Sequence, residues 1–253
     1  MLLSINPGCT QHRLTNAEAD ERSIHCSLPS LLFDSLAASC GVRPQPNACR
    51  GEMSTASDDG SNGYETVASI YIAGRGTRSR VGDSIGAGVV TAWAESFPPG
   101  ATVLDLGSGP GEPSTRILQE AGLTTYAVDA SPTMVAAFRE RFPGVPIEQN
   151  TVEASEFFNR TFGGVLAWGL MFLLEPAAQA LVIQKVARAL EPQGRFLFTA
   201  HQQALEWLDA MTGRRSQSLG AHAYEQLLHD AGLMWVAEAQ DEGENHYFFV
   251  EKA

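Results

Sequence analysis

Several features are scarce or absent in this sequence, and each absence excludes a class of protein. No hydrophobic run approaches the roughly 18 residues of a membrane-spanning helix. The N-terminus lacks the basic region and apolar core of a secretory signal. No His-Glu-x-x-His motif is present, which argues against zincin-type metalloenzymes. We therefore expect a cytoplasmic protein that does not associate with membranes.

Basic residues are also few: 17 Lys and Arg stand against 29 Asp and Glu, which gives a net charge of −12. Binding to nucleic-acid phosphates depends on a basic surface. The composition therefore argues against a nucleic-acid partner. It leaves the oligomeric state undetermined.

Cysteine is confined to the first fifty residues, at Cys9, Cys26, Cys40 and Cys49. None of these forms a Cys-x-x-Cys pair, so a zinc site is not indicated and we expect no bound metal. Residues 1–60 show no sustained hydrophobic period and are predicted to be a flexible or disordered extension. Met53 stands near the end of this segment. We hypothesise that the functional chain starts there, and the alternative is a regulatory arm.

The most informative stretch is Val103 to Gly111, which reads Val-Leu-Asp-Leu-Gly-Ser-Gly-Pro-Gly. Its apolar residues are typical of a strand buried in a parallel sheet. Its three alternate glycines allow a tight turn and the close approach of a ligand to the backbone. The chain then enters a predicted helix, whose first turn would direct backbone N–H groups at that ligand. A second apolar strand ends at Asp129, about twenty residues after the glycines, where nucleotide-binding folds place a ribose-binding carboxylate.

This pattern resembles motif I of the class I S-adenosylmethionine-dependent methyltransferases. The resemblance extends from Ile85 to Lys252. It implies a doubly wound α/β fold with a mostly parallel seven-stranded sheet, helices on both faces and a C-terminal hairpin whose last strand is antiparallel. Residues 61–253 would form this domain. Trp207-Leu208-Asp209 and the segment Asp241 to Tyr247 resemble a bacterial and fungal group of small-molecule methyltransferases.

The resemblance and the strand ends together predict the cofactor site. The acid of motif I, the glycine turn, the end of the second strand and the residues after the third and fourth strands would contact S-adenosylmethionine. Relatives often carry an aspartate where this chain has Thr151, so the adenine contact would fall to the Thr151 hydroxyl or the Val152 backbone. Met134 and Trp168 have core packing as their alternative. The full set of predicted cofactor residues is Asp105, Gly107, Ser108, Gly109, Gly111, Asp129, Ala130, Met134, Thr151, Val152 and Trp168.

Acceptor and catalytic residues are predicted from their positions near strand ends. Tyr71 and Arg75 precede motif I, in a segment that covers the cofactor in similar proteins. Met171 and Trp207 complete the predicted substrate residues. A general base would assist transfer to a hydroxyl or a protonated amine. His201 is the first candidate for that base, followed by Asp209 and His246, and a surface or structural role is the alternative for each.

The predicted function is transfer of a methyl group from S-adenosylmethionine to a small molecule by direct displacement, with S-adenosylhomocysteine as the product. A protein substrate and a non-catalytic cofactor-binding role are the alternatives within this fold. A nicotinamide-dependent dehydrogenase is disfavoured, because its turn is Gly-x-Gly-x-x-Gly and here the glycines fall at 107, 109 and 111.

Overall fold

The computed structural model describes residues 60–76 and 84–253. The chain divides into two units, Met1–Met53 and Ser54–Ala253, and all described residues lie in the second. The four cysteines and Met53 lie outside the described residues. The expectations about residues 1–60 therefore stay predictions.

Seven strands form the main sheet in the order β3-β2-β1-β4-β5-β9-β8. β9 is antiparallel to both β5 and β8, and the pairings from β3 to β5 are parallel. This confirms the predicted sheet and the antiparallel last strand. The strands are β1 Thr102–Leu106, β2 Thr124–Asp129, β3 Ile147–Gln149, β4 Phe162–Ala167, β5 Leu190–Thr199, β8 Leu233–Gln240 and β9 His246–Lys252.

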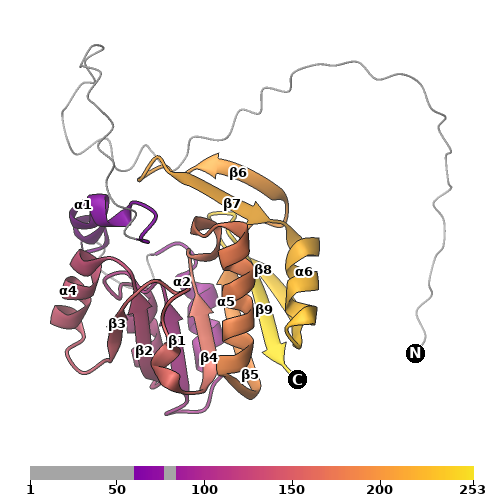
Figure 1. Cartoon of the computed structure of the whole chain (residues 1–253). Helices are drawn as coiled ribbons and strands as arrows, with labels where there is room; N and C mark the ends of the chain where they lie inside the picture. Colours follow the sequence, from indigo (N-terminus) through magenta and orange to yellow (C-terminus); the bar gives the residue numbers. More distant parts are fainter. Residues whose placement is uncertain (1–59, 77–83) are drawn as a thin grey trace, which may run out of the picture. The chain divides into compact units, whose positions relative to one another are not determined.

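Helices cover both faces of the sheet (Figure 1). They are α1 Tyr64–Gly76, α2 Ala87–Glu95, α3 Ser114–Glu120, α4 Pro132–Arg141, α5 Pro176–Ala189 and α6 Ala221–Asp230. Apolar residues of α2 and α3 pack on one face of the sheet, and those of α5 and α6 pack on the other. α4 packs beside β2 through Phe138 and Phe142.

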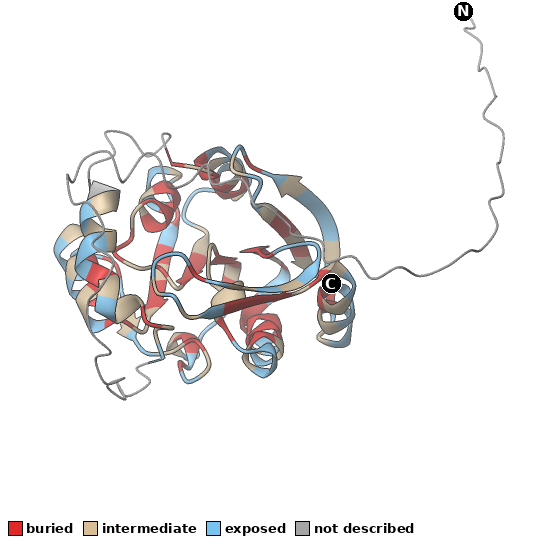
Figure 2. Cartoon of the chain, turned by 90° about the horizontal axis from the view of Figure 1, so that it is seen from above, coloured by how far each residue is buried: buried red, intermediate tan, exposed pale blue. Residues whose placement is uncertain are grey.

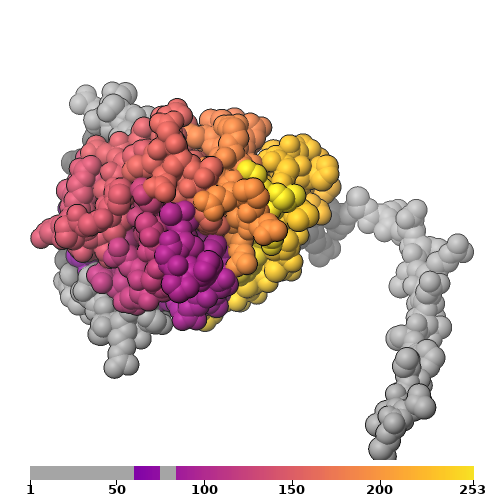
Figure 3. Space-filling model, turned by 90° about the horizontal axis from the view of Figure 1, so that it is seen from below, coloured from indigo at the N-terminus to yellow at the C-terminus, as the bar shows by residue number. Residues whose placement is uncertain are grey.

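The central strands β1 and β4 are buried along almost their whole length, as expected for a parallel sheet that is covered on both faces. In β1, Val103 joins the α2–α3 core and Leu104 joins the α5–α6 core, and both have 0% exposure. Buried residues follow the strands and the inner faces of the helices when the chain is viewed from above (Figure 2). Figure 3 shows the molecule from below, where the amino ends of the parallel strands lie and the atoms form a closely packed surface.

Two further elements lie over the carboxyl ends of the parallel strands (Figure 1). One is α1, and the other is a separate two-stranded hairpin made of β6 Ala204–Leu208 and β7 Arg215–Leu219. Neither element was predicted from the sequence. β6 alternates exposed and half-buried residues, whereas β7 has three buried polar residues in a row, so neither strand shows the usual alternation of apolar and polar residues.

No helix in the described part of the chain combines the length and the apolar character required to cross a membrane.

Candidate functional site

The glycine turn lies between the carboxyl ends of β1 and β2. The backbone N–H groups of Gly107 and Ser108 both donate to the Val128 carbonyl oxygen, at 2.8 and 3.2 Å. Gly107, Gly109 and Gly111 have φ values of 66°, 54° and 81°, a region that disfavours residues with a Cβ. The predicted turn is therefore present, and it requires glycine for backbone reasons alone.

The three glycines have different surroundings. A Cβ at Gly107 would lie 2.9 Å from Leu170, and one at Gly111 would lie 2.4 Å from Phe142. Among the described residues, a Cβ at Gly109 would have only Tyr71 within 4 Å, at 3.8 Å. Gly107 and Gly111 thus allow close packing within the protein. Within residues 60–76 and 84–253, the Gly109 backbone instead has room for a Cβ next to Tyr71, as close approach of a ligand requires.

Asp105 lies in the core behind the turn. It is 1% exposed, and its Oδ2 accepts hydrogen bonds from the hydroxyls of Ser114 and Thr115, both at 2.7 Å. Burial raises the pKa of this carboxyl to about 6. These bonds join β1 to the start of α3, so Asp105 supports the shape of the turn.

Asp129 ends β2 and lies beside Gly109. Its Oδ2 accepts the Gly109 N–H at 2.8 Å, and its Oδ1 accepts the Ser131 N–H at 2.9 Å. Its pKa is raised to about 6, mainly by burial and to a smaller extent by the charge of Glu65, while the two backbone hydrogen bonds act to lower it. A carboxylate oxygen accepts more than one hydrogen bond. Asp129 can therefore hold the turn in place and still accept hydroxyl donors from a ribose.

Glu65 of α1 binds the start of α4. It accepts hydrogen bonds from the Ser131 hydroxyl, from the Thr133 N–H at 3.1 Å and from the Thr133 hydroxyl at 2.6 Å. Ser131 is also the N-cap of α4, where its side chain accepts the Met134 N–H at 3.1 Å. These contacts fix α1 close to Asp129 and the glycine turn.

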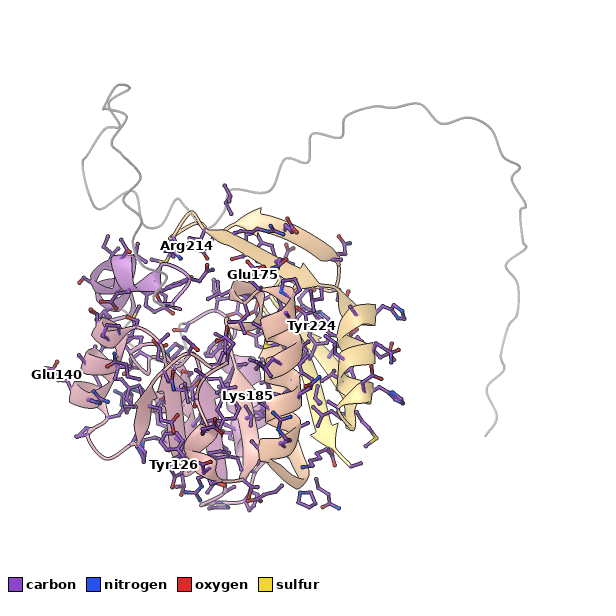
Figure 4. The ribbon with its side chains drawn as sticks, in the orientation of Figure 1. Tyr126, Glu140, Glu175, Lys185, Arg214 and Tyr224 are labelled. Atoms are coloured by element: carbon purple, nitrogen blue, oxygen red, sulfur yellow. The ribbon has the colours of Figure 1, made fainter. Side chains whose placement is uncertain are left out.

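The loop after β3 is the predicted adenine contact. The Thr151 hydroxyl accepts the Ala154 N–H at 3.2 Å, and Val152 is buried in the core. Lys185 of α5 supports this loop from behind, with its ammonium group donating to the carbonyls of Val152, Glu153 and Ser155 at 2.9, 2.6 and 2.6 Å. Figure 4 shows Lys185 midway along α5. Burial lowers the pKa of Lys185.

Two other predicted cofactor residues are largely buried. Ser108 is 4% exposed and Met134 is 2% exposed, so Met134 serves the core. Ala130 is half-buried and lies between Asp129 and the α4 cap.

Trp168 follows β4 and is half-buried against the α2–α3 core. It forms a side-chain hydrogen bond with the Tyr247 hydroxyl, and that hydroxyl donates to Asp241 at 2.8 Å. Burial, together with Asp241, raises the pKa of Tyr247. Trp168 therefore has a structural role, and contact with a sulfonium group stays a prediction.

An aromatic group lies where β4 and β5 meet the β6–β7 hairpin. The Trp207 and Phe172 ring centroids are 5.4 Å apart, and the exposed His201 ring packs edge-on to Trp207 at 4.9 Å. Burial and the neighbouring charge of His246 lower the pKa of His201. Met171 has 0% exposure and packs in the core, so as the structure stands its side chain offers no surface to a substrate.

The two other proposed bases are less favourably placed. Asp209 is 9% exposed and accepts bonds from the Tyr64 hydroxyl at 3.2 Å and the N–H groups of Met211 and Thr212 at 2.9 and 2.8 Å. These bonds shape the hairpin turn and join it to α1. His246 lies on β9, which β5 separates from β4, and its Nε2 is 3.3 Å from Glu238.

On α1, Tyr71 is half-buried and packs edge-on to Tyr64 with centroids 5.7 Å apart. The Arg75 side chain lies outside the described part of the chain, so its role stays a prediction.

Four site residues escaped the sequence analysis: Tyr64, Glu65, Phe172 and Lys185. Each acts through a partner distant in the chain, which a local pattern does not reveal. The placement of Glu65 in the first turn of a helix is the only local signal among them.

Other chemistries receive little support. Among residues 60–76 and 84–253, no group of three or more His, Cys, Asp or Glu side chains could hold a metal ion. Gly82 to Gly86 has the Gly-x-Ser-x-Gly spacing of serine hydrolases. Ser84, however, is 4% exposed and directly precedes α2, whereas a nucleophile elbow presents its serine at an exposed turn.

Comparison with known proteins gives a match to part of the chain and a similar fold. Residues 103–194 match the sequence profile of a family described as "Methyltransferase domain". No curated protein sequence matches the chain.

Three solved structures with a similar fold are described as methyltransferases. A 1,6-didemethyltoxoflavin N1-methyltransferase from Burkholderia thailandensis is 19% identical, with a TM-score of 0.57 over 83% of this chain and 93% of that chain. An amino pentose methyltransferase from Micromonospora echinaspora is 16% identical, with a TM-score of 0.56 over 73% of this chain and 97% of that chain. The glycopeptide N-methyltransferase MtfA is 18% identical, with a TM-score of 0.55 over 68% of this chain and 96% of that chain.

Proposed function

We propose that this chain is a class I S-adenosylmethionine-dependent methyltransferase that acts on a small molecule. The site of methyl transfer would lie at the carboxyl ends of β1, β4 and β5. The observation that carries the proposal is the pairing of Gly109 with Asp129. It combines open backbone at Gly109 with a carboxylate 2.8 Å from the Gly109 nitrogen. This pair offers a surface for the cofactor and an acceptor for its ribose hydroxyls.

The remaining cofactor contacts are assigned by position. The Thr151–Val152 loop would contact the adenine, and Lys185 would hold that loop in place through three carbonyls. Bound S-adenosylmethionine supplies a methyl group that is already activated on a sulfonium sulfur. The protein has to align the acceptor with that methyl group and exclude water.

His201 is the residue that we assign to proton removal. Its lowered pKa leaves the imidazole neutral at pH 7, so it can accept a proton from an acceptor hydroxyl or amine. Its edge-on contact with Trp207, a predicted substrate residue, supports this assignment. Asp209 and His246 are assigned supporting roles, because the first shapes the hairpin turn and the second lies beyond β5.

The acceptor is proposed to be a small molecule because the structural relatives named above include enzymes that act on didemethyltoxoflavin and on an amino pentose. The cytoplasmic location expected from the sequence stays a prediction.

A turnover assay tests the proposal. The full chain would be incubated with S-adenosylmethionine and a panel of small heteroaromatic, phenolic and amine acceptors, and release of S-adenosylhomocysteine would be measured. We expect release with at least one acceptor, and release at least about tenfold slower in Asp129→Asn when S-adenosylmethionine is below saturation. Release that is equal in the wild type and Asp129→Asn would contradict the assigned site.

A further inference from the structure

The inner face of the β6–β7 hairpin lies directly over the carboxyl end of β5. Residues paired across an antiparallel ladder share one face, and here Trp207 pairs with Ser216 while Leu205 pairs with Ser218. The Ser218 hydroxyl donates to the His201 carbonyl at 2.8 Å, which directs this face toward the end of β5.

The opposite face of the hairpin points away from this position. There, Glu206 and Arg215 form an exposed ion pair at 2.5 Å. Gln217 donates to Glu175 at the amino end of α5, at 3.2 Å, and Figure 4 shows Glu175 beneath the hairpin. The hairpin is thus fixed from two sides, and the Trp207 face has a defined orientation.

Trp207 meets a second ring on this face. Phe172 follows β4 in a short 3-10 helix, Met171–Leu173, and packs against Trp207 with a tilt of 48°. Both rings remain half-buried, whereas the core phenylalanines Phe196 and Phe198 have 0% exposure. A partly exposed aromatic pair at a ligand-binding edge offers a surface for a flat ring.

Ser216 adds a second, independent observation. The residue is 1% exposed, yet its hydroxyl has no hydrogen-bond partner in the part of the chain that the structure describes. Cβ atoms of directly opposed residues lie about 4.5–5.5 Å apart, so this hydroxyl is a neighbour of the Trp207 side chain. Buried polar groups are almost always paired, and an unpaired one calls for an explanation such as an absent ligand.

We propose that Trp207, Phe172 and Ser216 form an acceptor subsite for a planar aromatic molecule with a polar atom at its edge. This inference rests on the proposed function, because it names the substrate class of the same site. The acceptor ring would enter between the Trp207 and Phe172 rings, which would separate to admit it. Its polar edge would then pair with the Ser216 hydroxyl.

The test uses two probes with the same carbon skeleton, 2-naphthol and its saturated counterpart decahydro-2-naphthol. Binding to the full chain would be measured by saturation-transfer NMR titration, with and without S-adenosylhomocysteine. We expect 2-naphthol to bind about twofold to tenfold more tightly than the saturated alcohol, the range of an aromatic pair contact. Equal binding of the two probes, or no binding of 2-naphthol, would overturn the subsite.

Variants locate the effect. Trp207→Leu should remove the preference for 2-naphthol, and Trp207→Phe should retain part of it. Trp235→Leu is the matched control, because Trp235 is also half-buried but packs on Phe248 at the β8 edge. Equal effects of Trp207→Leu and Trp235→Leu would contradict the proposal.

Ser216→Ala separates the polar contact from the stacking. It should weaken 2-naphthol binding without lowering the thermal unfolding temperature, because the hydroxyl has no bond to lose. Unchanged 2-naphthol binding in Ser216→Ala would overturn the polar contact.

The two levels of proposal fail in different ways. If S-adenosylhomocysteine does not bind the wild type but 2-naphthol binds through Trp207, the subsite stands and the cofactor assignment fails. If S-adenosylhomocysteine binds and the probes do not discriminate, the proposed function stands and the subsite fails.

Discussion

The carboxylate of Asp129 accepts the backbone N–H of Gly109 at 2.8 Å, across the twenty residues that separate them in sequence. This bond joins the middle of the glycine turn to the end of the neighbouring strand. It brings the two predicted features of a nucleotide site into one structural unit.

Replacing Asp129 by Asn should weaken S-adenosylhomocysteine binding by about 1.5–3 kcal/mol, the range for hydrogen bonds to a charged group. The substitution keeps one oxygen acceptor for the turn and removes the charge. Calorimetric titration of the full chain measures the effect. Glu140→Gln is a suitable control, because Glu140 is an exposed carboxylate on α4. Equal affinities of the wild type and Asp129→Asn would remove Asp129 from the ribose site.

Binding should also depend on pH, because burial raises the pKa of Asp129 to about 6. A protonated carboxyl accepts ribose hydroxyls less well, so affinity should fall as the pH drops through 6. For a pKa of about 6, the apparent affinity at about pH 5 would be roughly tenfold below that at neutral pH. Calorimetry across this range measures the change, and Asp129→Asn should flatten the profile.

Removal of the Glu65 charge gives a second check on this titration. Because that charge helps to raise the pKa of Asp129, Glu65→Gln should move the midpoint of the binding profile to lower pH. A midpoint that stays fixed or rises would contradict the assignment.

The stability of the ligand-free protein should change in the opposite direction. Between the ordinary pKa of 3.8 and the raised pKa of about 6, the native carboxyl of Asp129 binds more protons than the unfolded one. The contribution of Asp129 to the free energy of unfolding therefore falls as the pH rises through this window. The same sign applies to Asp105, whose pKa is also about 6. Chemical denaturation of the wild type and of both Asp→Asn variants measures these contributions, and a rise with pH assigned to either carboxyl would contradict the sign.

Gly109→Ala separates the cofactor role from backbone strain. Gly109 and Gly122 have φ values of 54° and 75°, and a Cβ at either position meets nothing closer than 3.8 Å. Both substitutions should destabilise the fold by about 1–2 kcal/mol, the strain of a left-handed residue. Only Gly109→Ala should also reduce S-adenosylhomocysteine binding. Parallel urea denaturation and calorimetry compare the two, and equal binding losses would contradict our placement of the cofactor.

Lys185→Met should loosen the loop after β3. The Lys185 ammonium group donates hydrogen bonds to three backbone carbonyls, and the substitution removes this donor. We expect faster amide exchange in residues 151–156 and weaker S-adenosylhomocysteine binding. Arg188→Met on the same helix is the control, because Arg188 is exposed. Unchanged exchange in this loop would show that the contact is dispensable.

The central fold could be predicted from the sequence because its signals are local. β1, the glycine turn and β2 each have a characteristic residue pattern, and Ser131-Pro132 at the start of α4 has the residue types typical of an N-cap and first turn. Met134 and Phe138 followed helical spacing and proved to be core residues. These features depend on backbone geometry and burial, which short patterns report well.

The two elements that lie over the site, α1 and the β6–β7 hairpin, could not be predicted in the same way. α1 is fixed by Glu65 on Ser131 and Thr133, sixty-six and sixty-eight residues away. The hairpin is fixed by contacts such as the hydrogen bond from the Ser218 hydroxyl to the His201 carbonyl. Its polar sequence does not show the apolar pattern of a strand. Met171 was predicted to contact substrate because it follows β4, but its side chain turns into the core. A residue that follows a parallel strand lies near the site, but its position in the sequence does not show whether its side chain points into the site or into the core.

The most direct test of the account is calorimetric titration of the full chain with S-adenosylmethionine, S-adenosylhomocysteine and NAD. We predict saturable binding of the first two compounds and no binding of NAD. Binding of NAD in place of S-adenosylmethionine, or binding of none of the three, would contradict the assigned cofactor site.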